Sequence, residues 1–176
     1  TKGATAFLMA ADRADTPLMR VLLELGADPM LPNATGSTPL MVAAGLGTTS
    51  PEEEAGTEVE AVESVKLLLE RGAEVNVVDG NGDTAMHGAA YGNYPAVVRL
   101  LAERGADPQI WSRPNQQGRT PLFIAEGFRG GPPRPSRPTI DAVSQLMLTA
   151  GLSFEGQRPA IRDTYGHLDI LINNAG

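Results

Sequence analysis

Residues 38–44 read Thr38-Pro39-Leu40-Met41-Val42-Ala43-Ala44, and similar stretches occur at three other places in the 176-residue chain. These are Thr5-Ala6-Phe7-Leu8-Met9-Ala10-Ala11, Thr84-Ala85-Met86-His87-Gly88-Ala89-Ala90 and Thr120-Pro121-Leu122-Phe123-Ile124-Ala125. Recurrence of one unit at a period of roughly 20 to 50 residues signals a stacked-repeat architecture. Because one unit cannot bury its apolar face alone, its neighbours must cover it.

A second, leucine-rich segment follows each copy and closes on glycine. The four segments are Val21-Leu22-Leu23-Glu24-Leu25-Gly26, Leu67-Leu68-Leu69-Glu70-Arg71-Gly72, Leu100-Leu101-Ala102-Glu103-Arg104-Gly105 and Leu146-Met147-Leu148-Thr149-Ala150-Gly151. Glycine after an apolar helical run is a typical helix stop. Each repeat is therefore predicted to be a pair of helices.

The spacing of the repeated threonines supports this alignment. Thr5 and Thr38 are 33 residues apart, whereas Thr38 and Thr84 are 46 apart and Thr84 and Thr120 are 36 apart. The unit is thus 33 residues long, and about 13 and 3 residues are added in the second and third intervals. We expect the added residues to lie in loops.

These features resemble the ankyrin-repeat family, whose 33-residue unit has a T-P-L-H-x-A helix start, a leucine-rich second helix and a G-A-D-x-N turn. The resemblance implies an all-α solenoid of four helix pairs with short hairpin fingers. It covers residues 1–157, with repeats at about 1–33, 34–79, 80–114 and 115–157. The signature histidine survives only as His87, but small residues still permit close helix contact at Ala10, Ala11, Ala43, Ala44, Ala89 and Ala90.

The first copy is close to the consensus although it begins abruptly at Thr1. Repeat arrays usually need terminal repeats with polar outer faces. We therefore expect at least one more repeat upstream of this copy.

Two insertions separate the first and second helices of their repeats. One spans about residues 48–61 and is acidic, with Glu52, Glu53, Glu54, Glu58 and Glu60. The other spans about residues 129–139 and is basic, with Arg134 and Arg137 among prolines and glycines. We expect long surface loops that leave the same edge of the solenoid. The two loops attract each other, hold a partner, or stay solvated without a role.

The charge balance argues against several kinds of function. Fourteen Lys and Arg against 21 Asp and Glu give a net charge of −7, which disfavours generic nucleic-acid binding. No run approaches the roughly 18 to 20 apolar residues of a membrane span, and the absence of cysteine excludes a thiol nucleophile. Residues 1–105 carry 7 basic and 15 acidic side chains, whereas residues 106–176 carry 7 and 6. A partner with a basic patch would be steered to the first half.

Motifs for catalysis, cofactors and metals are lacking. Residues 79–83 imitate the start of a calcium loop, but Thr84 and Ala90 stand where that loop needs glycine and a bidentate glutamate. We interpret these residues as the tip of a hairpin finger, in which Asn-Gly suits a tight turn. No nucleophile elbow or phosphate-binding loop occurs. We predict no enzymatic activity and no cofactor, and the resemblance implies that His87 hydrogen-bonds loop backbone.

Residues 158–176 do not continue the repeat. Residues 166–176, read as G-H-L-D-I-L-I-N-N-A-G, resemble the fourth-strand segment of short-chain dehydrogenases, which lies beside the dinucleotide cofactor. The glycine-rich cofactor turn and the Tyr-x-x-x-Lys of that family are missing, so hydride chemistry is excluded for this sequence. The tail is a fused dehydrogenase fragment, a coincidental apolar tail or a joining error, and residues 169–172 could cap the last repeat.

The ankyrin resemblance also implies a concave groove lined by finger tips and by the ends of the first helices. The family's variable contact positions fall on Asp12, Arg13, Ala34, Thr35, Ser37, Leu46, Asn81, Asp83, Tyr91, Gln116, Gln117, Arg119 and Phe128. Tyr91, Arg119 and Phe128 stand out, since exposed aromatic and arginine side chains usually anchor interfaces. Phe128 either does so or folds back on the core. Trp111 lies in the lengthened finger at 110–117 and is expected to pack in the core.

Three functions are compatible with these features. The first is a non-enzymatic scaffold, one module of a larger bacterial-type ankyrin protein, that binds another protein through the groove. The second is a recruiting or regulatory module fused to a short-chain dehydrogenase-like oxidoreductase, and the third is a structural spacer. We expect a monomer that binds neither nucleic acid nor membrane. A cytoplasmic location is favoured, although the sequence does not determine the compartment.

Overall fold

The computed structural model describes residues 2–51, 56–129 and 134–154, and every regular element in this part of the chain is helical. The helices are α1 (Ala6–Asp12), α2 (Thr16–Glu24), α3 (Pro39–Ala43), α4 (Glu58–Glu70), α5 (Ala85–Gly92), α6 (Pro95–Glu103), α7 (Pro108–Trp111), α8 (Pro121–Ala125) and α9 (Arg137–Thr149).

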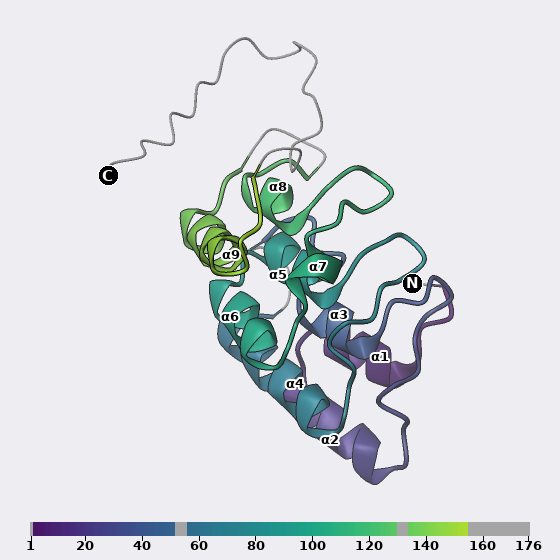
Figure 1. Cartoon of the computed structure of the whole chain (residues 1–176). Helices are drawn as coiled ribbons and strands as arrows, with labels where there is room; N and C mark the ends of the chain where they lie inside the picture. Colours follow the sequence, from purple (N-terminus) through teal and green to yellow (C-terminus); the bar gives the residue numbers. More distant parts are fainter. Residues whose placement is uncertain (1, 52–55, 130–133, 155–176) are drawn as a thin grey trace.

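Eight of these helices form four consecutive pairs, α1/α2, α3/α4, α5/α6 and α8/α9 (Figure 1). The first helices contact one another in the order α1, α3, α5 and α8, and the second helices do so in the order α2, α4, α6 and α9. The chain is thus a two-layered, all-α solenoid, which confirms the fold class that the repeats predict. The short helix α7 was not predicted, and it occupies the lengthened third interval.

The repeated threonine begins each first helix because its side chain caps the helix. The hydroxyl oxygens of Thr5, Thr38, Thr84 and Thr120 accept a hydrogen bond from the backbone N–H three residues later, at 3.1, 3.3, 3.4 and 3.2 Å. Such a cap satisfies an N–H that has no partner inside the helix and contributes about 1 kcal/mol. The period of the sequence is therefore also a period of helix starts.

Small residues let the first helices approach one another closely. The six alanines predicted for this role are all buried. At Gly88 in α5 a Cβ atom would lie 2.7 Å from the carbonyl oxygen of Met41 and 2.9 Å from the amide nitrogen of Leu46. The backbones of α3 and α5 are thus in direct contact, because no larger residue fits between them.

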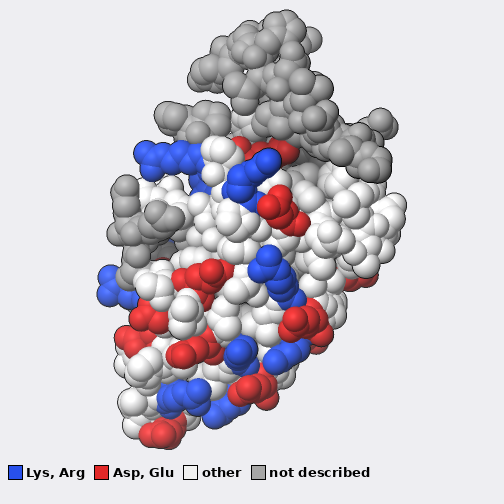
Figure 2. Space-filling view, turned by 90° about the vertical axis from the view of Figure 1, so that its left-hand side faces the viewer, with Lys and Arg blue, Asp and Glu red and all other residues white. Residues whose placement is uncertain are grey.

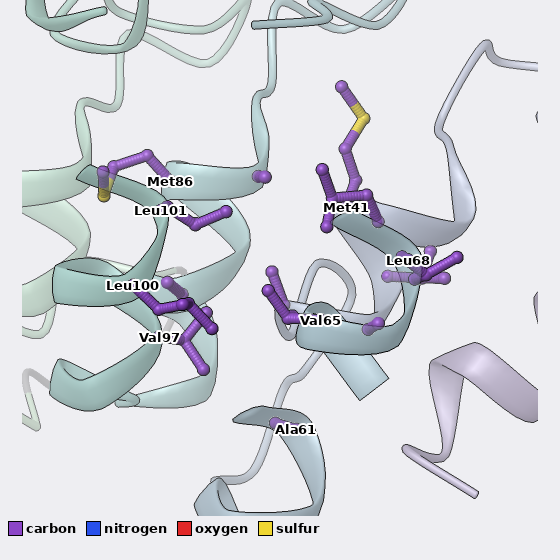
Figure 3. Packing of buried hydrophobic residues seen from close by; sticks show 14 of the residues in the cluster. Met41, Ala61, Val65, Leu68, Met86, Val97, Leu100 and Leu101 are labelled. Atoms are coloured by element: carbon purple, nitrogen blue, oxygen red, sulfur yellow. The ribbon is translucent and has the colours of Figure 1, made fainter. Parts of the chain in front are cut away.

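The second helices bury large apolar side chains against this layer of first helices. Val65 and Leu68 of α4 and Val97 and Leu101 of α6 are fully buried in one continuous core (Figure 3). One polar pair is included in this layer, since the hydroxyls of Thr16 and Ser64 lie 2.8 Å apart between α2 and α4. Each of these two buried hydroxyls therefore has a hydrogen-bond partner.

Both insertions lie between the helices of one repeat, as expected, but they are shorter than the sequence predicted. Glu58–Ala61 belong to α4, because the Thr57 hydroxyl and the Glu60 carboxylate form a capping box that starts the helix at Glu58. Residues 137–139 likewise belong to α9. Glu52, Glu53 and Glu54 lie outside the described residues, so attraction between the two loops stays a prediction.

The first repeat exposes apolar side chains at positions that the second repeat buries. Met9 is 59% exposed, whereas Val42 at the same position of the second repeat is 7% exposed. Val21 is 50% exposed, and its counterpart Leu67 is 3% exposed. In the second repeat these positions are covered by the preceding helix pair, through the contacts of α1 with α3 and of α2 with α4. An additional repeat upstream remains a prediction.

Two leucine substitutions test the stacking. Leu101 is fully buried and Leu25 is 78% exposed, near the same end of their helices. We expect Leu101→Ala to lower the free energy of unfolding by about 2–5 kcal/mol, because it leaves a cavity between helix pairs. Leu25→Ala should change it by less than about 0.5 kcal/mol. Urea unfolding followed by circular dichroism measures both, and equal losses would contradict this packing.

Candidate functional site

Three short fingers connect the repeats, and each closes on an Asn or Asp side chain. In the fingers 33–37, 79–83 and 115–119 the side-chain Oδ1 of Asn33, Asp79 or Asn115 accepts hydrogen bonds from the backbone N–H groups two and four residues later. The glycine at the fourth position has a positive φ in each finger, +83° in Gly36, +82° in Gly82 and +72° in Gly118. Asn and Asp favour this turn because their oxygens mimic a backbone acceptor.

Neighbouring fingers are joined by a ladder of side-chain and backbone hydrogen bonds, which we call the finger ladder. The Ser37 hydroxyl donates to Asp79 Oδ2 at 2.8 Å, and Asn115 Nδ2 donates to Asp83 Oδ1 at 2.8 Å. The backbone adds bonds from Gly80 N to the Thr35 oxygen and from Gln116 N to the Asn81 oxygen, each at 2.8 Å. The fingers therefore form one rigid wall.

The finger ladder uses Asp79, the residue that opens the calcium-like sequence. Both of its carboxylate oxygens already accept hydrogen bonds from protein donors, Oδ1 from its own finger and Oδ2 from Ser37. The finger interpretation of residues 79–83 is thus confirmed. The turn differs in detail from a two-residue Asn-Gly turn, because Gly82 has a positive φ and Asn81 does not.

His87 links the third repeat to the third finger. Its Nδ1 accepts from the Thr84 backbone N–H at 3.2 Å, which leaves Nε2–H to donate to the Arg119 carbonyl oxygen at 3.2 Å. The ring is fully buried, and burial lowers the pKa of His87 to about 4. The expected bond from His87 to loop backbone is confirmed. Met41 and Phe123 replace it in the second and fourth repeats.

A groove with a volume of about 990 Å³ runs across the first helices. The fingers precede these helices and the insertions follow them, so the two sets lie at opposite ends of each helix. The groove is lined at one end by finger residues and at the other by Gly47–Pro51, Arg134 and Pro135, with Val42, Leu46 and Tyr91 also contributing. The insertions therefore supply a second wall opposite the finger ladder.

Eight of the predicted contact residues line this groove: Asp12, Ser37, Leu46, Asn81, Asp83, Tyr91, Gln117 and Arg119. They differ in accessibility. Asp12 and Gln117 are exposed, and Leu46, Asn81 and Arg119 are half-buried. Ser37, Asp83 and Tyr91 are nearly buried, and the first two are held in the finger ladder.

The other predicted contact residues lie outside the groove. Ala34, Thr35 and Gln116 belong to the fingers but do not line it, and Arg13 lines a smaller cavity of about 260 Å³. The Phe128 ring stacks on Phe123, with centroids 4.5 Å apart and planes inclined by 7°. Phe128 thus packs on Phe123 of its own repeat, and its role as a partner contact stays a prediction.

The structure adds groove residues that the sequence did not indicate. Arg129 lines the groove and donates to the Tyr91 carbonyl oxygen at 2.7 Å and to Asn93 Oδ1 at 2.5 Å. Asn93 ends α5 with a left-handed φ of +58°, a conformation that Asn tolerates. The Asn93-to-Arg129 pairing has no local sequence signal, but the recurring Asn/Asp-x-x-Gly of the fingers was readable in the sequence.

Trp111 belongs to the core. Its side chain is 2% exposed and packs in the main apolar cluster, as expected. Its Nε1–H is buried and has no hydrogen-bond partner in the described part of the chain. Since Trp111 does not line the groove, its fluorescence should report folding rather than occupancy of the groove.

Four stacked helix pairs joined by fingers define a helical-repeat protein. Residues 55–130 match the family model for ankyrin repeats in three copies, which identifies these repeats as ankyrin repeats. The described helix-pair solenoid therefore includes ankyrin repeats.

Two of the similar curated proteins described next are named for ankyrin repeats. An ankyrin repeat and LEM domain-containing protein 1 homolog from Caenorhabditis elegans is 36% identical over 46% of the chain and 12% of its own length. The human neurogenic locus notch homolog protein 4 is 33% identical over 68% of the chain and 6% of its own length. An ankyrin repeat-containing protein from Schizosaccharomyces pombe is 32% identical over 46% of the chain and 38% of its own length. The chain thus spans well under half of each of these relatives.

The tail, residues 158–176, lies outside the described residues, and the comparisons give no support to its resemblance to dehydrogenases. Among the described helices, none combines the length and apolar character of a membrane span. The described residues also contain no group of three or more His, Cys, Asp or Glu arranged to hold a metal ion.

Substitutions of Asp79 test the finger ladder. Asp79→Ala removes the acceptor of two backbone N–H groups and of the buried Ser37 hydroxyl, so we expect a loss of about 1–3 kcal/mol in unfolding free energy. Asp79→Asn keeps Oδ1 and copies Asn33 and Asn115, and it should cost clearly less. Urea unfolding of the two variants compares them. Equal losses would show that the turn does not depend on this oxygen.

The pKa of His87 predicts a pH dependence of stability. Because folding lowers this pKa from 6.5 to about 4, the unfolded chain binds the proton more readily, and stability falls as pH decreases from about 6.5 to 4. The contribution lost is about 3 kcal/mol. His87→Met, which copies Met41, should flatten the pH profile of unfolding free energy in that window. A variant profile parallel to that of the wild type would contradict the buried, neutral ring.

Proposed function

We propose that the protein is a non-enzymatic scaffold that binds an extended segment of another protein in its groove. Ankyrin repeats are generally protein–protein interaction modules, which supports the class of function. The repeat domain is proposed to span residues 1–157, with 158–176 as a separate tail. The identity of the partner is left to experiment.

The observation that carries the proposal is a groove with two walls across consecutive repeats. The finger ladder fixes one wall before any ligand binds, because neighbouring fingers already share their hydrogen bonds. A surface that is already ordered loses little conformational entropy on binding, so more of the interaction energy appears as affinity. This arrangement suits an elongated ligand better than a small molecule.

The accessible groove residues are the proposed contacts. Asn81, Gln117 and Arg119 offer polar groups from the finger side of the groove. Asp12, Leu46 and the insertion at 47–51 line it from the other end of the first helices. The nearly buried Ser37, Asp83 and Tyr91 are proposed to shape the groove. Arg13, Thr35, Gln116 and Phe128 are proposed to contribute only if a partner extends beyond it.

The alternative of a recruiting module fused to an oxidoreductase depends on the tail, and no described residue favours it. Within the described residues, the lining of the groove holds neither a histidine nor a cysteine to act as a catalytic base or nucleophile. Binding is therefore the function that the geometry supports best.

Single cysteines can test the groove, because the natural sequence has none. Gln117→Cys places a thiol in the groove, and the control Gln145→Cys places one on the exposed side of α9. Partners captured from native lysate with the whole chain are purified and added back, and the alkylation rates are measured. We expect the partner to slow alkylation at position 117 by at least about tenfold and to leave position 145 unchanged. Equal rates at both positions with the partner bound would place the interface elsewhere.

A further inference from the structure

We propose that the end of the groove formed by the third and fourth repeats binds a carboxylate-rich, extended segment of the partner protein. This inference rests on the proposed function and names the chemistry of the ligand. It depends on three arginine side chains, Arg119, Arg129 and Arg134, which all line the groove.

Arg129 is held in place by neutral acceptors only. Its guanidinium donates to the main-chain oxygens of Ala90 and Tyr91 and to Asn93 Oδ1, at 3.3, 2.7 and 2.5 Å. These groups lie at the C-terminal end of α5, where the helix dipole favours a cation, but they carry no full negative charge. Its Nε–H is buried and meets no acceptor among the described residues. The positive charge of Arg129 is therefore fixed in position by groups that carry no full negative charge.

Tyr91 places a second arginine beside the first. Arg119 Nη1 donates to the Tyr91 hydroxyl at 3.3 Å, while Arg129 donates to the main-chain oxygen of the same tyrosine. The two guanidinium groups thus lie at the two ends of one tyrosine, on opposite sides of the groove. Arg119 is half-buried and uses only one side-chain hydrogen bond, so its remaining donors can receive a ligand. Arg134 extends the set at the exposed edge.

Arg119 and Arg129 are held by neutral hydrogen-bond partners, and the charge of Asp83 interacts with that of Arg119. Arg119 donates to the Tyr91 hydroxyl, and Arg129 donates to Asn93 Oδ1 and to main-chain oxygens. Asp83, the acidic residue nearest in the groove, is 6% exposed and already accepts from Asn115. Burial raises the pKa of Asp83, whereas the hydrogen bond from Asn115 and the positive charge of Arg119 lower it. Asp12, the other acidic residue of the lining, belongs to the first repeat.

The distribution of charge elsewhere makes this cluster distinctive. On the face that carries α6 and α9, basic and acidic side chains alternate (Figure 2). The chain as a whole has a net charge of −7, so a continuous phosphate backbone would be repelled outside the groove. A short acidic peptide avoids this repulsion because only its carboxylates need to reach the arginines. Guanidinium groups bind carboxylates through paired, charge-assisted hydrogen bonds.

The test uses the whole chain and two fluorescein-labelled peptides, one with six consecutive glutamates and one with six glutamines. Fluorescence anisotropy at low salt should show binding of the glutamate peptide and none of the glutamine peptide. The variant Arg119→Gln/Arg134→Gln should weaken binding at least about tenfold, whereas Arg71→Gln/Arg104→Gln on the exposed ends of α4 and α6 should leave it within about twofold. Arg129 is not substituted, because its hydrogen bonds to the main-chain oxygens at the C-terminal end of α5 stabilise that helix end. Circular dichroism checks that both variants fold.

Several results would overturn the proposal. One is equal binding of the two peptides, and another is equal weakening by both double variants, which would indicate attraction to any surface arginine. Binding that appears only in Glu52→Gln/Glu53→Gln/Glu54→Gln would show that the acidic ligand is intramolecular and not a partner. If the glutamate peptide fails but the captured partner still protects position 117, this inference falls while the proposed function stands.

Discussion

The structure depends on burial between helix pairs. One pair has too few residues to enclose an interior, so its apolar side chains become buried only when the next pair covers them. The first helices achieve this through alanine and through Gly88, whose missing side chain allows the backbones of α3 and α5 to touch. The second helices fill the remaining space with leucine, valine and methionine. The order of the pairs along the chain is thereby also their order in space.

This close stacking brings the polar ends of the repeats together. Because first helices lie side by side, the fingers that precede them also lie side by side, near enough for Ser37 to bond Asp79 and for Asn115 to bond Asp83. The groove follows from the same geometry, with fingers at one end of each first helix and insertions at the other. Its chemistry changes along the array, from Asp12 in the first repeat to three arginines in the fourth.

Much of this could be predicted from the sequence, because the period, the threonine caps and the leucine-rich second helices are local signals. Eight of the residues chosen as contacts line one groove, since positions equivalent in the repeat are equivalent in space. The sequence could not show which of them would be buried and hydrogen-bonded within the fold, and so less accessible to a partner. Asp83 has the same chemistry as Asp12, yet its neighbour Asn115 lies 32 residues away and holds it in the wall. The position of Arg129 also depends on a distant residue, Asn93. The position of Phe128 depends on Phe123, which stands in the fourth repeat where the family has histidine.

The two walls of the groove differ in how freely they can change. Every finger is bonded to its neighbour, so a residue gained or lost there would disturb the register of the whole row. The insertions between the helices of one repeat are bonded to a neighbouring repeat at single residues, as Arg129 is to Asn93 and Gly56 to Tyr94, and the rest of such a loop tolerates changes of length at small entropic cost. Evolution can therefore raise, lower or recharge this wall one repeat at a time, and acquire a new ligand without rebuilding the stack beneath it.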